Sequence, residues 1–349
     1  MIGVLTLLTT GIIGCSQSSQ VTYTPVSADI SWPIGETTVT ATITRPDNDE
    51  IHPAIVFIAG SGPTDKDWNS PLLPGTNGSA KLMAEEFAKI GFVTIRYDKW
   101  VTGPNAEKNA TLLTGKISMA SHLEQVSGAV SQLLARPDVD PRQIFVVGNS
   151  EGTIHAMNYQ LEREPKFAGL VLVAPPGRTM VEVTHGQIEA QVASLPNADE
   201  IMAGFDRLMS DFLAEKPFTA DPAVPEWLNN LFQGFNAPVN LPFARELFKV
   251  DASSLLSQIV SPTLVVIGKK DIQVDWQLDG QVLEAAAGNK DNISLSYPEN
   301  ANHVLKNETR PRSALSAADA LTYNASDKVL DTEALNVIIE WLNKQARIH

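Results

Sequence analysis

The stretch from Gln143 to Ala156 constrains this chain more than any other, because a short apolar run leads directly into Gly-Asn-Ser-Glu-Gly. Residues 144–147 are apolar and mostly β-branched, which predicts a buried strand. A helix-prone segment follows and stops at Pro165. Gly148 and Gly152 let strand and helix approach closely, so the turn between them holds the Ser150 hydroxyl away from the sheet. The layout is that of a nucleophile elbow and predicts Ser150 as a nucleophile.

Apolar runs recur on both sides of this stretch and alternate with helical patterns. Such alternation is typical of βαβ units, and it predicts an α/β fold with a doubly wound, mostly parallel sheet. An antiparallel pair is expected first, at Ala28–Ile34 and Thr37–Arg45. Buried strands are then expected at 54–59, 92–96, 144–147, 168–174, 262–268 and 293–297. Helices are expected from Ser79, as the capping residue, to Gly91, and at 118–135, 276–287 and 332–345.

The alternation is interrupted between residues 178 and 254, where helical patterns replace buried strands. This segment follows the strand after the elbow helix, so it leaves the sheet at its carboxyl edge, beside Ser150. It is rich in aromatic residues. We predict a helical cap, or lid, at 178–254, with the sheet domain formed by 28–177 and 255–349. The aromatics are Phe205, Phe212, Phe218, Trp227, Phe232, Phe235, Phe243 and Phe248.

A serine nucleophile needs a general base and a carboxylate that orients the base. Asp271 follows one predicted strand of the sheet, and His303 follows the last one. In doubly wound sheets such loops meet at the carboxyl edge. Asp275 and Asp279 lie farther from their strand end. The other histidines are placed less well for this role. His122 and His155 lie inside predicted helices, His52 precedes a strand, His185 lies at the start of the cap, and His349 is the last residue.

Backbone N–H groups must stabilise the oxyanion that forms in acyl transfer. One N–H group is expected from Glu151, directly after the nucleophile. The second is expected from Ser61, within the Gly60-Ser-Gly62 turn that follows the 54–59 strand. A tight turn without this role is the alternative for Gly60-Ser-Gly62.

Five segments between residues 54 and 306 resemble the α/β-hydrolase superfamily, in particular bacterial serine hydrolases and esterases related to dienelactone hydrolase and to S33 and S9 peptidases. They are 60–67, 95–99, 148–152, 270–274 and 302–306. The order Ser150, Asp271, His303 matches that superfamily. The chain departs from many relatives at Asn149, where they have histidine, and at Trp100-Val101, where they have Arg-Gly. Asp65 and Asp98 are expected to hold loops.

The first residues resemble a bacterial lipoprotein signal. Residues 1–14 carry no charge, and Ile12-Ile-Gly-Cys15 resembles a lipobox, although no Lys or Arg precedes it. We therefore expect a signal peptide at 1–15, lipidation of Cys15, a flexible tether at 16–27 and a lipid-anchored protein of the bacterial cell envelope. A frayed apolar N-terminus on a cytoplasmic protein is the alternative.

The net charge of −14, from 40 acidic and 26 basic residues, argues against nucleic acid as a partner. The sequence predicts no metal site and no cofactor. The function expected is hydrolysis of small-molecule carboxylic esters through an acyl-enzyme. A peptidase or amidase with the same triad is one alternative. A lipoprotein that binds but does not turn over its ligand is another. The oligomeric state is left open.

Overall fold

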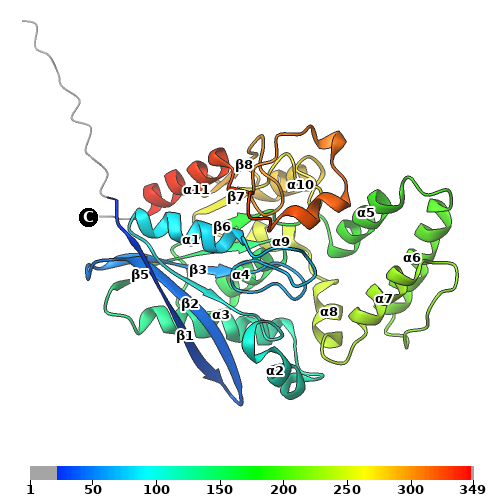
Figure 1. Ribbon diagram of the computed structural model, residues 1–349, viewed down its shortest axis with the longest axis horizontal. Coiled ribbons are helices and arrows are strands. Elements are labelled where there is room, and N and C mark those ends of the chain that lie inside the picture. The colour runs from blue at the N-terminus through cyan, green and yellow to red at the C-terminus, as the bar shows by residue number, and fades with distance from the viewer. Residues whose placement is uncertain (1–21, 347–349) are drawn as a thin grey trace, which may run out of the picture.

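One eight-stranded sheet organises the computed structural model, which describes residues 22–346 (Figure 1). Its strand order is β1-β2-β4-β3-β5-β6-β7-β8. The β1–β2 and β2–β4 pairs are antiparallel, and all other neighbours are parallel. This confirms the predicted α/β-hydrolase fold with a mostly parallel sheet. The strands are β1 (Pro25–Ile34), β2 (Thr37–Pro46), β3 (His52–Ile58), β4 (Val93–Tyr97), β5 (Val139–Asn149), β6 (Gly169–Val173), β7 (Thr263–Val266) and β8 (Ile293–Ser296).

Helices cover both faces of this sheet. In Figure 1, α1 and α11 lie along one face and α3 along the other. The helices of the sheet domain are α1 (Ser79–Lys89), α2 (Ala106–Leu113), α3 (Met119–Leu134), α4 (Glu151–Glu162), α9 (Ala252–Gln258), α10 (Leu278–Ala287) and α11 (Thr332–Gln345). Three short 3₁₀ helices complete it: η1 (Gly103–Asn105), η2 (Arg312–Ala314) and η3 (Ala317–Thr322).

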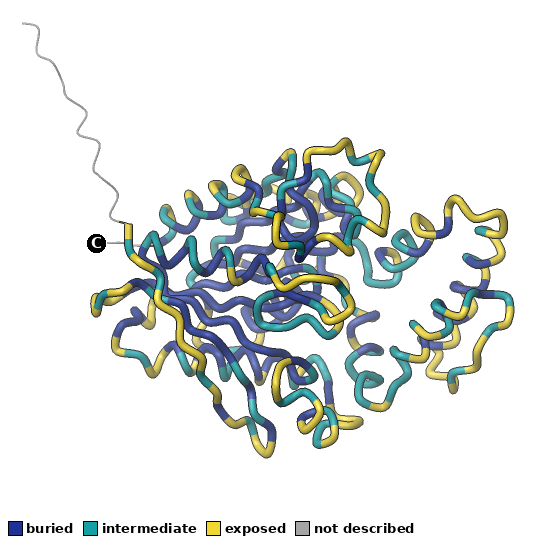
Figure 2. The backbone as a smooth tube through the Cα atoms, viewed as in Figure 1, coloured by how far each residue is buried: buried dark blue, intermediate teal, exposed yellow. Residues whose placement is uncertain are grey.

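The inner strands are buried on both faces, which explains why most of them are continuous apolar runs. The exception is β4, in which the buried polar residues Thr94 and Arg96 alternate with apolar ones. Every residue of β3, β4 and β6 is buried. Figure 2 shows these central strands in the buried colour, whereas much of β1 at the sheet's edge is exposed. The sheet is therefore a rigid frame, and the loops at the carboxyl ends of its strands are held in fixed register.

The cap is a separate helical body beside the sheet (Figure 1). Its helices are α5 (Met180–Val192), α6 (Ala198–Leu213), α7 (Glu226–Phe235) and α8 (Leu241–Leu247). They enclose a second hydrophobic cluster, distinct from the main core, that runs from Ile188 to Phe248. The cap ends earlier than residue 254, because α9 begins at Ala252 and its Leu256 is buried in the main core.

The N-terminal boundary also differs from the sequence prediction, which placed a tether at 16–27. The chain is already paired in β1 from Pro25, and the Ser27 and Thr44 hydroxyls are 2.8 Å apart. Before β1, the Tyr23 N–H donates to the Lys89 carbonyl at 2.9 Å. The start of β1 was missed because its first residues are mostly exposed and leave no apolar alternation in the sequence.

The start of α1 corrects a second prediction. The N-cap is Gly78 and not Ser79, which is the first helical residue. A capping side chain would accept a hydrogen bond from one of the first N–H groups of the helix. Here the Ala80 N–H donates to the Asp67 carbonyl at 3.2 Å instead. A backbone group from the preceding loop thus replaces the side-chain cap, and the buried Ser79 hydroxyl has no hydrogen-bond partner.

Several short elements were not predicted at all, among them α2 and the three 3₁₀ helices η1, η2 and η3, and they bury few apolar side chains. In α2 the only buried residue is Asn109, whose side chain exchanges hydrogen bonds with the backbone of Thr38. The 3₁₀ helices η2 and η3 contain no buried residue. Hydrophobic periodicity does not detect elements this short, and even α2 packs only Leu113 against the main core.

Candidate active site

Ser150 occupies the sharp turn between β5 and α4. Its backbone has φ 53° and ψ −121°, a conformation that L-residues rarely adopt. The Ser150 N–H donates to the Val173 carbonyl of β6 at 2.8 Å, which holds the turn against the neighbouring strand. The flanking glycines are sterically required, because a Cβ on Gly148 would lie 2.6 Å from the Gly152 carbonyl oxygen. Ser150 itself is half-buried and open to a substrate.

The loop after β3 lies against this turn. Parallel pairing sets Ile58 opposite Gly148, so two residues later Gly60 is level with Ser150. A Cβ on Gly60 would be 3.3 Å from the Ser150 Cβ. Ser61 is exposed, and Glu151 is the first residue of α4. The two residues predicted to donate oxyanion N–H groups therefore flank the predicted nucleophile.

Asp271 and His303 are brought together from loops that follow β7 and β8. The Asp271 Oδ2 lies 2.8 Å from the His303 Nδ1. The other oxygen, Oδ1, accepts the N–H groups of Gln273 at 2.7 Å and Val274 at 2.9 Å. Asp271 is fully buried, so its carboxylate has a fixed direction. Donation from Nδ1 to the carboxylate leaves Nε2 as the nitrogen that can accept a proton.

Asn149 connects the histidine loop to the nucleophile turn. Its Nδ2 donates to the His303 carbonyl at 3.0 Å, and the side chain is buried. This is the position where many relatives have histidine. Asp271 and His303 are thus hydrogen-bonded to each other, and the His303 backbone is hydrogen-bonded to Asn149, the residue directly before Ser150.

The other acidic residues of interest have different partners. The Asp275 Oδ1 accepts the N–H groups of Gln277 at 2.9 Å and Leu278 at 3.0 Å, and its Oδ2 is 2.8 Å from the Arg312 guanidinium. Asp98 accepts from the Lys66 N–H at 3.0 Å and from the Thr40 hydroxyl at 2.6 Å. Asp275 thus shapes its own turn, and Asp98 holds the loop that follows β3.

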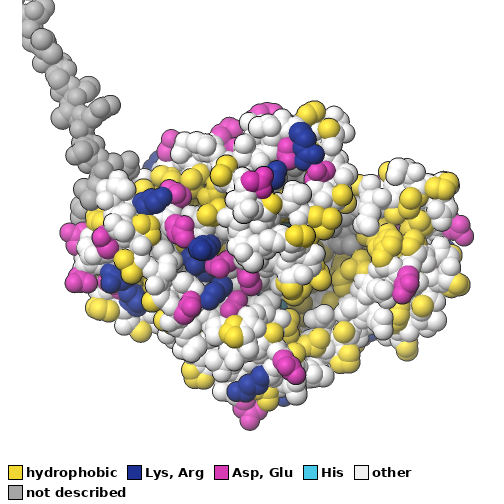
Figure 3. Space-filling view, in the orientation of Figure 1, with side chains coloured by type: hydrophobic (Ala, Val, Ile, Leu, Met, Phe, Trp, Pro, Cys, Tyr) yellow, Lys and Arg dark blue, Asp and Glu magenta, His cyan; other side chains and the backbone are white. Residues whose placement is uncertain are grey.

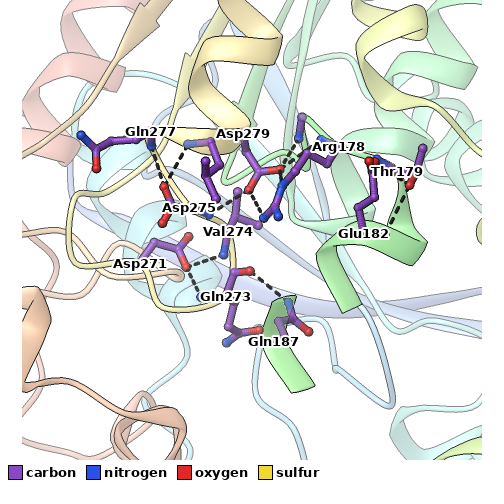
Figure 4. Close-up of polar contacts among 12 residues, drawn as sticks. Arg178, Thr179, Glu182, Gln187, Asp271, Gln273, Val274, Asp275, Gln277 and Asp279 are labelled. Atoms are coloured by element: carbon purple, nitrogen blue, oxygen red, sulfur yellow. Dashed lines mark hydrogen bonds and ion pairs between the residues drawn. The ribbon is translucent and has the colours of Figure 1, made fainter. Parts of the chain in front are cut away.

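Asp279 forms a junction between cap and sheet domain that sequence reasoning missed (Figure 4). It is fully buried. Its Oδ1 accepts the N–H groups of Gly177 and Arg178, each at 3.0 Å, and its Oδ2 is 2.9 Å from the Arg178 Nη2. These hydrogen bonds raise the pKa of the Arg178 guanidinium. One buried carboxylate therefore binds the first residues of the cap segment.

The same junction reaches the loop of the predicted catalytic acid. The Asp275 N–H donates to the Asp279 Oδ2 at 2.9 Å, and the Gln187 side chain of α5 donates to the Gln273 carbonyl at 3.0 Å (Figure 4). Gln273 in turn donates its N–H to Asp271. The position of the cap and the orientation of the acid are thus linked through two consecutive hydrogen bonds, from Gln187 to Gln273 and from Gln273 to Asp271.

A hollow separates the cap from the sheet domain, and apolar side chains face it from both sides (Figure 3). Four of the eight cap aromatics are buried, namely Phe205, Phe212, Phe232 and Phe248. The other four are half-buried, namely Phe218, Trp227, Phe235 and Phe243. Of these four, Phe218, Trp227 and Phe235 pack against the cap's own hydrophobic cluster, and Phe243 packs against the main core.

Within residues 22–346, His, Cys, Asp and Glu side chains form no group of three or more that could hold a metal ion. None of the helices in this range has both the length and the apolar character that a bilayer span requires. Cys15 and the predicted signal segment lie outside the described residues.

Comparison with known proteins identifies the family and the fold. A family model described as serine aminopeptidase, S33, matches residues 76–310, more than half of the chain. The esterase EstD of Thermotoga maritima is 24% identical over 263 residues, a match that covers 75% of this chain and 57% of that protein. The chain thus spans little more than half the length of this relative.

Solved structures show the same fold at low sequence identity. The α/β-hydrolase GrgF from Penicillium sp. sh18 superposes with a TM-score of 0.56 at 13% identity, over 93% of this chain and all of that one. The hypothetical protein PA2218 from Pseudomonas aeruginosa gives 0.54 at 15% identity, over 98% of this chain and all of that one. Proline iminopeptidase from Mycobacterium smegmatis gives 0.52 at 14% identity, over 91% of this chain and 98% of that one. On the strength of the family match, with the fold and the resemblance both confirmed, this chain belongs to the serine aminopeptidase S33 family of α/β-hydrolases.

Proposed function

We propose that this hydrolase is a serine esterase that cleaves carboxylic esters through an acyl-enzyme, with Ser150 as nucleophile, His303 as base and Asp271 as its orienting acid. The observation that carries the proposal is the 2.8 Å contact between Asp271 and His303, joined through Asn149 to the turn that bears Ser150. Ester cleavage in particular is supported by the match to an esterase.

The proposed reaction follows from the roles of these groups. The Ser150 Oγ attacks the carbonyl carbon while its proton passes to the His303 Nε2, and the carbonyl electrons move onto oxygen. The N–H groups of Ser61 and Glu151 stabilise that oxyanion. When the carbonyl re-forms, the alcohol leaves with the proton from His303. Water, deprotonated by His303, then attacks the acyl-enzyme, which releases the carboxylic acid and restores Ser150.

A peptidase or amidase that uses the same residues is the second candidate, and the description of the family favours it. The two candidates differ in the leaving group and not in the triad. A panel of p-nitrophenyl esters and aminoacyl-p-nitroanilides separates them, together with labelling by a fluorophosphonate probe. We expect labelling at Ser150 and faster turnover of the esters. Faster turnover of the anilides would favour the peptidase, and a protein that neither labels nor turns over any substrate would be a binding protein.

The half-buried cap aromatics are expected to set acyl-chain preference. Burying one methylene contributes about 0.8 kcal/mol, which is roughly fourfold in specificity. We predict that Trp227→Ala and Phe218→Ala lower the ratio of butyrate to acetate hydrolysis. The ratio should fall by about fourfold for each methylene of the acyl chain that loses its contact with the aromatic ring and becomes exposed to water. Acetate turnover itself should stay nearly unchanged, since acetate is too short to reach the cap.

The matched control is Tyr23→Ala, which removes a half-buried aromatic that packs on His52, the first residue of β3, far from the carboxyl edge of the sheet. Its butyrate-to-acetate ratio should equal that of the wild type. If neither cap substitution moves the ratio away from this control, the cap is a structural cover and not a specificity element.

Membrane attachment through Cys15 remains part of the proposal. Its support is the uncharged apolar leader that ends in Ile-Ile-Gly-Cys. When the gene is expressed in a bacterium with a labelled fatty acid, the wild-type protein should carry label and sediment with membranes. Cys15→Ser should carry none. Equal absence of label from both proteins would move the enzyme to another compartment or require a different start site.

A further inference from the structure

Lys99 is a buried cation next to the nucleophile turn, and the acyl-transfer steps above do not use it. It follows β4, and its side chain is 6% exposed. The ammonium donates to the Gly60 carbonyl and lies 3.4 Å from the Glu151 Oε1. Lysine is rarely buried to this degree unless paired, because removing an ammonium from water is costly. Both of its partners belong to the segments predicted to form the oxyanion hole.

The contact with Gly60 orients the neighbouring N–H group. The Gly60 carbonyl and the Ser61 N–H belong to the same peptide unit. In a trans peptide these two bonds point in opposite directions. An ammonium that holds the carbonyl oxygen therefore fixes the direction of the Ser61 N–H. It also polarises the peptide, which makes this N–H a stronger donor.

The contact with Glu151 ties the same ammonium to the residue that supplies the second N–H group. The Glu151 side chain is 2% exposed, and its Oε1 is also 3.3 Å from the His155 Nε2. Burial opposes ionisation of Glu151, but the charge of Lys99 and the hydrogen bond with His155 hold its pKa well below the usual range. The carboxylate is thus an anion with two fixed partners.

Aromatic rings close this cluster on the side of the cap. His155 stacks on His122 with ring centroids 4.6 Å apart, and burial together with the nearby His155 places the pKa of His122 well below its usual value. Phe243 of α8 lies 4.6 Å from the His122 ring and 5.8 Å from the His155 ring. Water is therefore kept from the Lys99–Glu151 pair, and its geometry is supported from both domains.

We propose that Lys99 is a positioning residue for the oxyanion hole: its single ammonium clamps the Gly60–Ser61 peptide to Glu151, so that the Ser61 and Glu151 N–H groups face the same point. This inference rests on the proposed function. It predicts that loss of Lys99 weakens binding of the transition state and leaves binding of the ground-state ester largely intact.

The test compares Lys99→Met with Arg96→Met, each measured for ester kinetics, fluorophosphonate labelling rate and thermal stability. Arg96 is the matched control, since it is a buried cation of β4, 3% exposed, that pairs with Asp67 at 2.9 Å. Both variants should lose stability. Only Lys99→Met should lose about 10²-fold in kcat, the order seen when one oxyanion donor is removed, with KM changed by less than about threefold.

A second variant separates positioning from charge neutralisation. Lys99→Met/Glu151→Gln removes both buried charges, so stability should recover relative to Lys99→Met, while kcat stays low because nothing holds the Gly60 carbonyl. Recovery of kcat in the double variant would overturn the proposal, and so would a Lys99→Met enzyme with wild-type kcat and labelling rate.

Fluorophosphonate labelling distinguishes failure of this inference from failure of the proposed function. The probe forms a tetrahedral phosphonyl adduct on Ser150 whether the natural substrate is an ester or an amide. If the wild type labels but hydrolyses no ester, the esterase proposal fails. The comparison of labelling rates still decides the role of Lys99, with about a 10²-fold slower rate expected for Lys99→Met.

Discussion

Ser150→Ala should lower kcat for ester hydrolysis by about 10⁴–10⁶-fold, the range typical for loss of a triad member. The physical reason is that no other group stands on the strained turn at which β5 ends. The fold should be retained, because the N–H that donates to the Val173 carbonyl belongs to the backbone and alanine keeps it. The measurement is steady-state turnover of p-nitrophenyl acetate, with the melting temperature recorded in parallel.

Ser131→Ala is a suitable control for this substitution. Ser131 is an exposed serine of α3 whose hydroxyl donates only to the Ser127 carbonyl of the same helix, at 2.8 Å. Its activity should equal that of the wild type. A purified Ser150→Ala enzyme that keeps more than about a tenth of wild-type turnover would be incompatible with Ser150 as the nucleophile.

His303→Ala should lower kcat nearly as much as Ser150→Ala does. Asp271→Asn should lower kcat by about 10⁴-fold. At position 271 the amide oxygen can still accept the N–H groups of Gln273 and Val274, so the loop should keep its shape. The amide nitrogen then faces the His303 Nδ1 as a donor. This donor favours the His303 tautomer in which the proton is on Nε2. A protonated Nε2 cannot accept the proton of the Ser150 hydroxyl.

Asp275→Asn tests whether the correct carboxylate has been assigned. Asp275 lies four residues away and is paired with Arg312 at 2.8 Å. This variant should retain most of the wild-type activity, with some loss of stability. An inactive Asp275→Asn enzyme beside an active Asp271→Asn enzyme would show that the orienting acid is Asp275.

Much of the fold could be predicted from local sequence. Most of the buried strands are continuous apolar runs because both faces of the sheet are covered, and this pattern needs no knowledge of distant residues. Ser150 could be found for the same reason, since the strand, the turn and the helix that define its position are contiguous. The pairing of Asp271 with His303 followed from chain order, because parallel strands bring their following loops to one edge.

The contacts that tune the site could not be predicted, because they join residues far apart in the chain. Asn149 and His303 are 154 positions apart, and Lys99 and Glu151 are 52 apart. Their contacts depend on strand register and on loop conformation, neither of which leaves a local pattern. Lys99 lies two residues after β4, in the 95–99 segment that resembles the superfamily, but nothing local indicated its contact with Glu151. For Asp279, inside the predicted 276–287 helix, no comparable signal existed.

The Asp279 junction has a consequence for engineering by domain exchange. A chimera that imports a cap from a relative would ordinarily be spliced just after β6, where the chain leaves the sheet to enter the cap. That splice replaces Arg178, whose guanidinium is the cation that pairs with Asp279, and it leaves the recipient's Asp279 as a buried carboxylate with backbone N–H partners alone. A Cβ at position 177 would in addition collide with the backbone of Asp279. Donor sequence should therefore begin no earlier than residue 179 and end before Asp251, which caps α9. Within those limits, the cap can be exchanged as a module while the recipient keeps its own acid loop.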